Sequence, residues 1–219
     1  MKSLTLWALL AVLPTSLLAV PTTKEVNQVA HNEVTSINTL EDVQMALSSH
    51  NIVRGQFTQT RIMEMFAQPL VSSGSFLLDK THGLLWQQTL PFPVELVLTQ
   101  DKLSQRFANQ EPQVITAQEN PMAFYFSHIF LSVFHGDTKQ LAEQFELTFT
   151  TNADHWAIEL SPKQAPLNAV FKQIVLNGNT DIESITLLEV RGDSTSIEFS
   201  DHTHQPDTLN DAEQAQFKF

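Results

Sequence analysis

Apolar residues recur at every second position over much of the chain, which is the spacing of β-strands that bury one face. The pattern is clearest in residues 70–98, where three strands follow one another. Residues 81–83, Thr-His-Gly, separate the first two strands as a hairpin turn in which Gly83 can take a positive φ. Three consecutive antiparallel strands, each with a large apolar face, need a cover. That cover is either protein alone or, in part, a bound ligand.

The same period predicts strands on both sides of this stretch. We expect one at 52–65 and a short one at 103–108, followed by an irregular connection at 111–121. Five further strands are expected, with turns such as Asn177-Gly178 between them, at 145–149, 156–160, 171–177, 182–190 and 195–199. This spacing favours a large antiparallel meander.

Two stretches change to helical spacing. Thr39 and Asp42 are placed as in a capping box, which predicts a helix from Thr39 to about Ser49. Residues 121–135 carry apolar side chains at intervals of three and four and are apolar on the remaining surface too. Such a helix must be buried on more than one side, so it is a candidate cover for the sheet. A short polar helix at 137–143 follows.

The two ends of the chain differ in composition from its middle. Residues 1–19 combine Lys2, an apolar run and Ala19 before a cleavage point, which is the pattern of a secretory signal peptide. We therefore expect export, a loose leader at 20–38, one domain at 39–200 and a loose polar tail at 201–219. The apolar run is too short to span a membrane.

Cysteine is absent from the sequence, which excludes a disulfide framework, a thiol nucleophile and a thiolate metal site. It also leaves no residue for a lipid anchor after the signal, so we expect a soluble protein. The formal charge of −12 disfavours phosphate backbones and anionic membrane surfaces as partners. Nucleic acid is therefore not expected to bind.

Several polar residues could support chemistry in principle. The candidate bases are His128, His135 and His155, and the candidate carboxylates are Glu64, Asp79 and Glu95. No nucleophile elbow, zinc-protease motif or phosphate loop accompanies them, so we expect no enzyme and no cofactor. His202 and His204 could bind zinc, but in a polar tail they are expected to be solvated, and no metal site is predicted.

A set of short motifs resembles the family of LolA, a periplasmic lipoprotein carrier, and above all its relatives linked to aryl-polyene and lipid export. The motifs are Phe57-Thr-Gln59, Pro-Leu-Val-Ser-Ser-Gly at 69–74, Gly-Leu-Leu-Trp at 83–86 and Pro91-Phe92. The resemblance is specific over 52–99 and weaker but collinear to residue 199. It implies a mainly β (α+β) fold, an open antiparallel half-barrel with covering helices, which binds acyl chains in its hollow.

The apolar faces and the resemblance together predict a lipid-binding cavity. Its expected lining is Phe57, Phe76, Leu78, Leu84, Trp86, Val94, Leu96, Phe126 and Phe130. Lys80 falls where the family has a basic residue and is a candidate headgroup contact. The expected function is a monomeric periplasmic carrier that takes a lipid or lipoprotein from an inner-membrane exporter towards an outer-membrane acceptor.

The cargo stays open, because lipoprotein, fatty acid, aryl polyene and glycolipid all offer acyl-like chains. The alternative is a non-carrier scaffold or accessory protein that docks on a periplasmic export partner through its acidic surface. A carrier should take up acyl species, whereas a scaffold should not.

Overall fold

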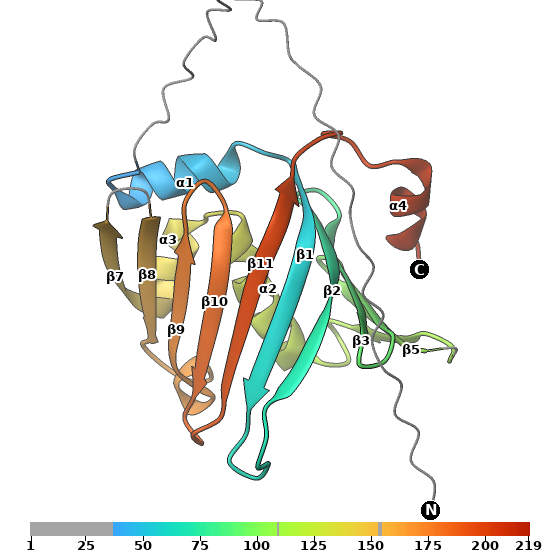
Figure 1. Ribbon diagram of the computed structural model, residues 1–219, viewed down its shortest axis with the longest axis horizontal. Helices are drawn as coiled ribbons and strands as arrows, with labels where there is room; N and C mark the ends of the chain where they lie inside the picture. The colour runs from blue at the N-terminus through green and yellow to red at the C-terminus, as the bar shows by residue number, and fades with distance from the viewer. Residues whose placement is uncertain (1–36, 109, 153–154) are drawn as a thin grey trace, which may run out of the picture. The chain divides into compact units, whose positions relative to one another are not determined.

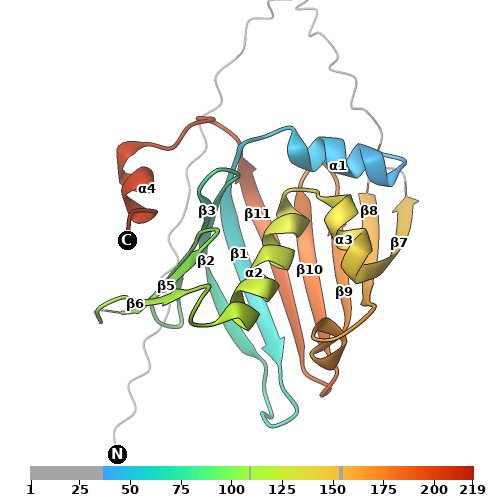
Figure 2. The same cartoon turned by 180° about the vertical axis from the view of Figure 1, so that it is seen from behind.

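The computed structural model describes residues 37–108, 110–152 and 155–219, excepting the side chains at 121–123, 126 and 130. These residues form one antiparallel sheet of eleven strands with helices on its concave face, which confirms the expected fold class (Figures 1 and 2). The elements in chain order are α1 (Leu40–Ser48), β1 (Ile52–Ile62), β2 (Leu70–Asp79), β3 (Gly83–Leu90), β4 (Val94–Leu98), β5 (Lys102–Phe107), β6 (Gln113–Thr116), α2 (Pro121–Phe134), α3 (Thr138–Gln144), β7 (Phe145–Asn152), β8 (His155–Pro162), the 3₁₀ turn η1 (Leu167–Ala169), β9 (Phe171–Gly178), β10 (Ile182–Glu189), β11 (Ser194–Thr203) and α4 (Asp211–Gln216).

The strand order is β6-β5-β4-β3-β2-β1-β11-β10-β9-β8-β7. Consecutive strands pair within β1–β6 and within β7–β11, and the pairing of β1 with β11 joins the two groups in the middle of the sheet. The chain therefore reaches one edge at β6 and resumes at the opposite edge with β7. The helices α2 and α3 make this connection and lie across the concave face, as Figure 2 shows.

Helix α1 begins at the predicted capping box. The Asp42 backbone N–H donates to Thr39 Oγ1 at 3.1 Å, and the Thr39 N–H donates to Asp42 Oδ2 at 2.9 Å. Its buried residue Val43, 1% exposed, joins the core beneath it. The helix therefore closes one end of the concave face.

Helix α2 confirms the expected helix at 121–135 and ends before Gly136, whose φ is +63°. Phe124 and Leu131, seven residues apart, are buried on one side of the helix, and Ile129 and Val133 are buried on the other. The prediction of burial on more than one side is therefore confirmed. Helix α3 follows, with Asp137 as its N-cap.

The predicted hairpin turn between β2 and β3 is confirmed. Gly83 has a φ of +123°, which disfavours other residues. A Cβ added there would also lie 2.0 Å from the carbonyl oxygen of Leu98. Glycine at this position therefore allows β3 and β4 to come together directly after the turn.

The sheet has an apolar patch on its convex side as well, which the period-two analysis overlooked. Leu77, Leu85 and Val97 are buried there, on three adjacent strands. Their cover comes from the C-terminal residues Leu209, Phe217 and Phe219. The second apolar face is possible because neighbouring strand positions point to opposite sides and both sets are apolar here.

The expectation of a loose tail at 201–219 differs from the structure. Strand β11 continues to Thr203, and α4 follows with a capping box between Asn210 and Glu213. The Arg54 guanidinium donates to both carboxylate oxygens of Glu213, at 2.6 and 2.8 Å. This ion pair and the terminal phenylalanines anchor a segment whose sequence is otherwise polar.

Two further differences concern the boundaries. A short strand, β6, occupies part of the predicted irregular connection and pairs with β5 through partners such as Lys102 and Thr116. The predicted signal peptide at 1–19 and almost all of the leader at 20–38 lie outside the described residues.

Candidate functional site

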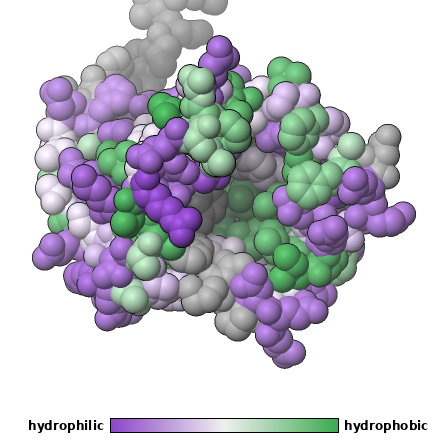
Figure 3. Space-filling view, turned by 90° about the horizontal axis from the view of Figure 1, so that it is seen from below, coloured by the Kyte–Doolittle hydropathy of each residue, from purple (hydrophilic) through white to green (hydrophobic). Residues whose placement is uncertain are grey.

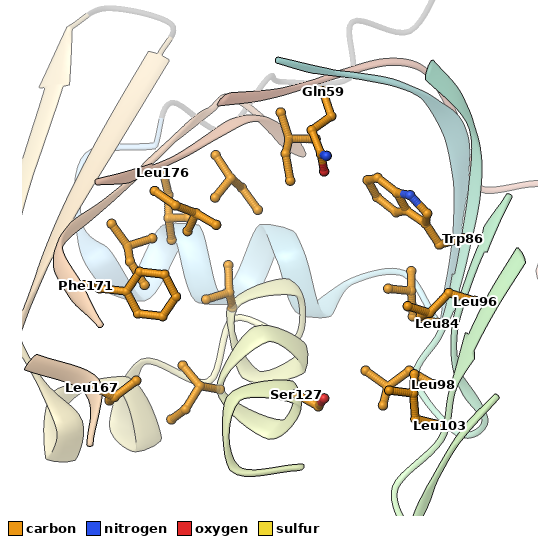
Figure 4. A pocket seen from close by; sticks show the side chains of 16 residues that line it. Gln59, Leu84, Trp86, Leu96, Leu98, Leu103, Ser127, Leu167, Phe171 and Leu176 are labelled. Carbon is orange, nitrogen blue, oxygen red and sulfur yellow. The ribbon is translucent and has the colours of Figure 1, made fainter. Parts of the chain in front are cut away.

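A cavity of about 390 Å³ lies between the concave face of the sheet and helix α2 (Figure 4). Its lining comes from both halves of the sheet and from the helix. The lining residues are Gln59, Leu84, Trp86, Leu96, Leu98, Leu103, Ser127, Ile129, Val133, Leu167, Phe171, Ile174, Leu176, Ile185, Leu187 and Ile197.

One wall is built by β3, β4 and β5. The strand register sets Trp86 opposite Leu96 and Leu84 opposite Leu98, so that alternate residues of each strand face the cavity. The indole of Trp86 stacks on the buried ring of Phe57, with their centroids 3.6 Å apart. Phe57 projects from β1 on the same face of the sheet, packs against the tryptophan and holds it in place.

The facing wall is built by β9, β10 and β11. Ile174 is opposite Leu187, and Ile185 is opposite both Leu176 and Ile197. Branched aliphatic side chains on three adjacent strands form a continuous apolar surface here. Figure 4 shows Leu176 and Phe171 on this side and Trp86 and Leu96 on the other, with the cavity between them.

Two polar side chains reach the cavity, Gln59 from β1 and Ser127 from α2. Figure 4 shows the Gln59 amide pointing into the cavity beside Trp86. Within the described part of the chain, none of the lining side chains carries a charge. Such a surface suits a long apolar chain, because no lining charge would have to be desolvated when the chain enters.

At one end of the sheet, where β1 finishes and β2 begins, the surface is hollowed, and hydrophobic residues gather around the hollow (Figure 3). Large apolar side chains stand exposed on the neighbouring turns. Met65 and Phe66 lie between β1 and β2 and are 76% and 49% exposed. Leu90 ends β3 and Phe92 lies between β3 and β4, and they are 61% and 58% exposed.

The predicted cavity residues divide into three groups. Leu84, Trp86 and Leu96 line the cavity directly. Phe57, Phe76 and Leu78 face the same side of the sheet but are buried in the core, so the prediction that they line the cavity is corrected. The reason is local packing, because the ring of Phe57 stacks on Trp86, and the ring of Phe76 packs against that of Phe199 with their centroids 5.1 Å apart.

The remaining predicted residues are placed as follows. Val94 is half-buried at the start of β4 and lies outside the cavity lining. Phe126 and Phe130 belong to α2, but their side chains lie outside the described residues. Sequence reasoning missed the wall from β9 to β11, although the alternation at 171–177 and 182–190 was the signal that could have found it.

Lys80 does not line this cavity. It follows β2, and its ammonium group donates to the carbonyl oxygen of Ser48 at the end of α1, at 2.5 Å. Burial lowers the pKa of Lys80 below its ordinary value.

The histidines considered for catalysis or metal binding do not form one cluster, although His128 and His135 line the same pocket. His128 Nε2 lies 2.9 Å from the carbonyl oxygen of Gln100, and His155 lies 3.3 Å from a carboxylate oxygen of Glu183. His204 contacts Asp181 at 3.1 Å. Among the described residues, no group of three histidine or acidic side chains is placed to hold a metal ion.

The candidate carboxylates take structural roles. Asp79 accepts from the backbone N–H of Thr81 at 2.8 Å and contacts His82 Nδ1 at 2.8 Å, so it stabilises the β2–β3 turn. Glu95 accepts from Arg106 at 2.6 Å on the neighbouring strand. None of these contacts brings a carboxylate to the apolar cavity.

No helix in the described residues is long and apolar enough to cross a membrane. A comparison with curated proteins found no match. Solved structures with a similar path of the backbone include a LolA superfamily protein from Nitrosomonas europaea. Its sequence identity is 9% and its TM-score is 0.43, and the alignment covers 80% of this chain and 97% of that one.

A domain from Vibrio parahaemolyticus, named for outer membrane lipoprotein sorting, has 10% identity and a TM-score of 0.45, over 82% of this chain and 97% of that one. The MucA/MucB complex of Pseudomonas aeruginosa has 15% identity and a TM-score of 0.39, over 80% of this chain and 59% of that one. These structural similarities are too weak to support a functional argument.

The sequence itself gives a stronger match. Residues 48–219 fit the family model described as outer membrane lipoprotein carrier protein LolA, and this range includes the whole sheet and α2. Because the match extends over most of the chain, the protein belongs to the LolA family.

Proposed function

We propose that this protein is an exported carrier that holds the acyl chain of a lipid or lipoprotein in its apolar cavity and takes it through the periplasm towards the outer membrane. The observation that carries the proposal is the uncharged cavity of about 390 Å³, with walls from both halves of the sheet. Membership of the LolA family supports it, because LolA proteins are lipoprotein carriers rather than enzymes.

The energetics favour such a ligand. Each methylene transferred from water into an apolar site contributes about 0.8 kcal/mol. A segment of about ten methylenes could therefore contribute about 8 kcal/mol before the costs of immobilising the chain are subtracted. An apolar cavity of this kind can thus bind an acyl chain reversibly, which a carrier needs in order to release its cargo.

Helix α2 is proposed to act as the movable cover of the cavity. It contributes Ser127, Ile129 and Val133 to the lining and connects the two edges of the sheet without being part of its hydrogen-bonded ladder. A displacement of α2 would therefore widen the cavity while leaving the strand pairing intact. Phe126 and Phe130 on this helix are proposed to contact the acyl chain.

The proposal is tested on protein purified from the periplasm without detergent. Native mass spectrometry should detect bound acyl species, and the delipidated protein should take up a fluorescent fatty acid with saturation at one site. Absence of both would contradict the carrier function and favour an accessory protein that docks on an export partner.

A further inference from the structure

A second pocket, of about 380 Å³, lies on another side of α2. In contrast to the acyl cavity it is polar and basic. Its lining includes Lys80 and His82 from the β2–β3 turn, Gln100 from the β4–β5 turn, His128 from α2, His135 directly after α2, and Gln140 from α3. Within the described residues, no carboxylate lines it.

The fold brings these donors together from four segments. His135 directly follows α2, and its backbone N–H still donates to the Leu131 carbonyl as in a helical turn, so it lies on the same side as His128, seven residues earlier. Ser132, between them on this side, donates to Gln140 Oε1 at 2.6 Å and so joins α2 to α3. The pocket therefore has side-chain donors on several sides rather than on one exposed face.

Lys80 is a partly buried cation without a carboxylate partner in the described residues. Its ammonium group donates to the Ser48 carbonyl, and burial lowers its pKa. By contrast, Arg54, Arg61 and Arg106 each pair with a carboxylate. In a chain with a net charge of −12, a half-buried ammonium group without a carboxylate partner among the described residues is a favourable position for an external anion.

His135 supplies an unused polar atom at the same place. Its Nε2 is buried and has no hydrogen-bond partner within the described residues. An unpartnered buried polar atom is costly, and a ligand that pairs with it removes the cost. Burial and the nearby Lys80 lower the pKa of His135, and an anion bound beside both groups would oppose this effect.

We propose that this pocket binds a phosphate group, held by Lys80, His135 and the neighbouring His128 and Gln140. A phosphate group fits because its several oxygens can accept from donors on different sides at once. The group can belong to free inorganic phosphate or to the headgroup of a lipid. In the second case the inference rests on the proposed carrier function.

The position of the pocket is compatible with a lipid headgroup. Gly83 and Gln100 line the polar pocket. Leu84, next to Gly83 on β3, and Leu98, the last residue of β4 and two residues before Gln100, line the acyl cavity. The polar pocket therefore begins where one wall of the apolar cavity ends.

The first test is a titration of the full mature chain with inorganic phosphate, followed by NMR of the histidine side chains and by calorimetry. We expect the ring signals of His135 and His128 to shift with saturation and the pKa of His135 to rise. Lys80→Gln should weaken phosphate binding at least tenfold. The matched control Lys139→Gln, at an exposed lysine of α3, should leave it unchanged.

The second test separates the two sources of phosphate. A short-chain lysophosphatidate is compared with a fatty acid of equal chain length, in wild type and in Lys80→Gln. Stronger binding of the phosphorylated lipid that depends on Lys80 supports a headgroup site even if free phosphate binds weakly. Binding of phosphate alone, without this preference, supports a free-anion site.

The proposal is overturned if neither phosphate nor lysophosphatidate shifts the signals of His128 and His135 in the wild-type protein. This readout does not require a variant, so poor folding of Lys80→Gln cannot obscure it. Uptake of the plain fatty acid is measured separately and reports on the carrier function alone. The two proposals can therefore fail independently.

Discussion

A tryptophan in place of Leu187 should reduce acyl-chain binding by filling part of the apolar cavity. Leu187 is half-buried, lies on β10 opposite Ile174, and faces the wall that contains Trp86. Because the leucine side chain borders open cavity space, a larger side chain can extend into it instead of displacing packed neighbours. The sheet should therefore tolerate the substitution.

The size of the effect follows from the space that is lost. Tryptophan has about six more non-hydrogen atoms than leucine in its side chain, and each excluded methylene costs about 0.8 kcal/mol of binding free energy. Complete exclusion of about six methylenes would cost about 5 kcal/mol, which is an upper limit. A chain that withdraws by about two methylenes loses about 1.6 kcal/mol, and its Kd rises slightly more than tenfold.

The assay is the displacement of a fluorescent fatty acid from delipidated protein, with thermal unfolding measured in parallel. Leu188→Trp is the matched control, because the next residue on β10 points to the opposite face of the sheet. If Leu187→Trp folds and binds with wild-type affinity, the acyl chain does not occupy this cavity. Leu187→Phe is the milder substitution if the tryptophan variant unfolds.

Two further outcomes are expected. Glu213→Ala should lower the free energy of unfolding by about 1–3 kcal/mol, measured by urea denaturation, because Arg54 loses a charge-assisted partner. The hydrogen bond from Arg54 lowers the pKa of Glu213. The stabilisation by this ion pair is therefore complete above the unfolded-state pKa of about 4.3 and is lost as the pH falls through the lower folded-state pKa. A stability advantage of the wild type over Glu213→Ala that persisted in stronger acid would contradict the assignment. Amino-terminal sequencing of periplasmic protein should begin near Val20, and recovery of Met1 would refute the predicted signal peptide.

Local sequence patterns were sufficient to predict most strands of the sheet. Period-two alternation located the strands because apolar residues recur at alternate, concave-facing positions, and the capping box at Thr39 and Asp42 marked the start of α1. The positive φ of Gly83 could be expected from the hairpin alone. These features depend on residues that are close in sequence, so they can be predicted from short stretches of the sequence.

Features that depend on distant partners could not be predicted in the same way. Phe57 and Trp86 both face the concave side, and only the curvature of the sheet determines that Phe57 lies beneath the tryptophan. The C-terminal segment appeared loose because its order depends on Arg54 and on the apolar patch around Leu85. The basic pocket was missed because α2 and two separate turns meet only in the folded chain.

The pairing of β1 with β11 determines when the sheet can be completed. The strands β1–β6 and β7–β11 form two local meanders, each held by hairpin neighbours. The contact between Phe57 and Phe199, by contrast, joins residues from opposite ends of the described chain. Contacts with such a large sequence separation form late, because the intervening chain must first be ordered.

During synthesis or transport across a membrane, β1 therefore emerges long before the strand that pairs with one of its edges. Until β11 follows, that edge presents unpaired backbone groups to any other extended chain nearby. Nine other strands of the described residues, β2–β10, emerge between β1 and β11. Chaperone protection of this edge is thus most valuable for incomplete chains, and truncations that remove β11 should aggregate even though β1–β6 retain their local hairpins.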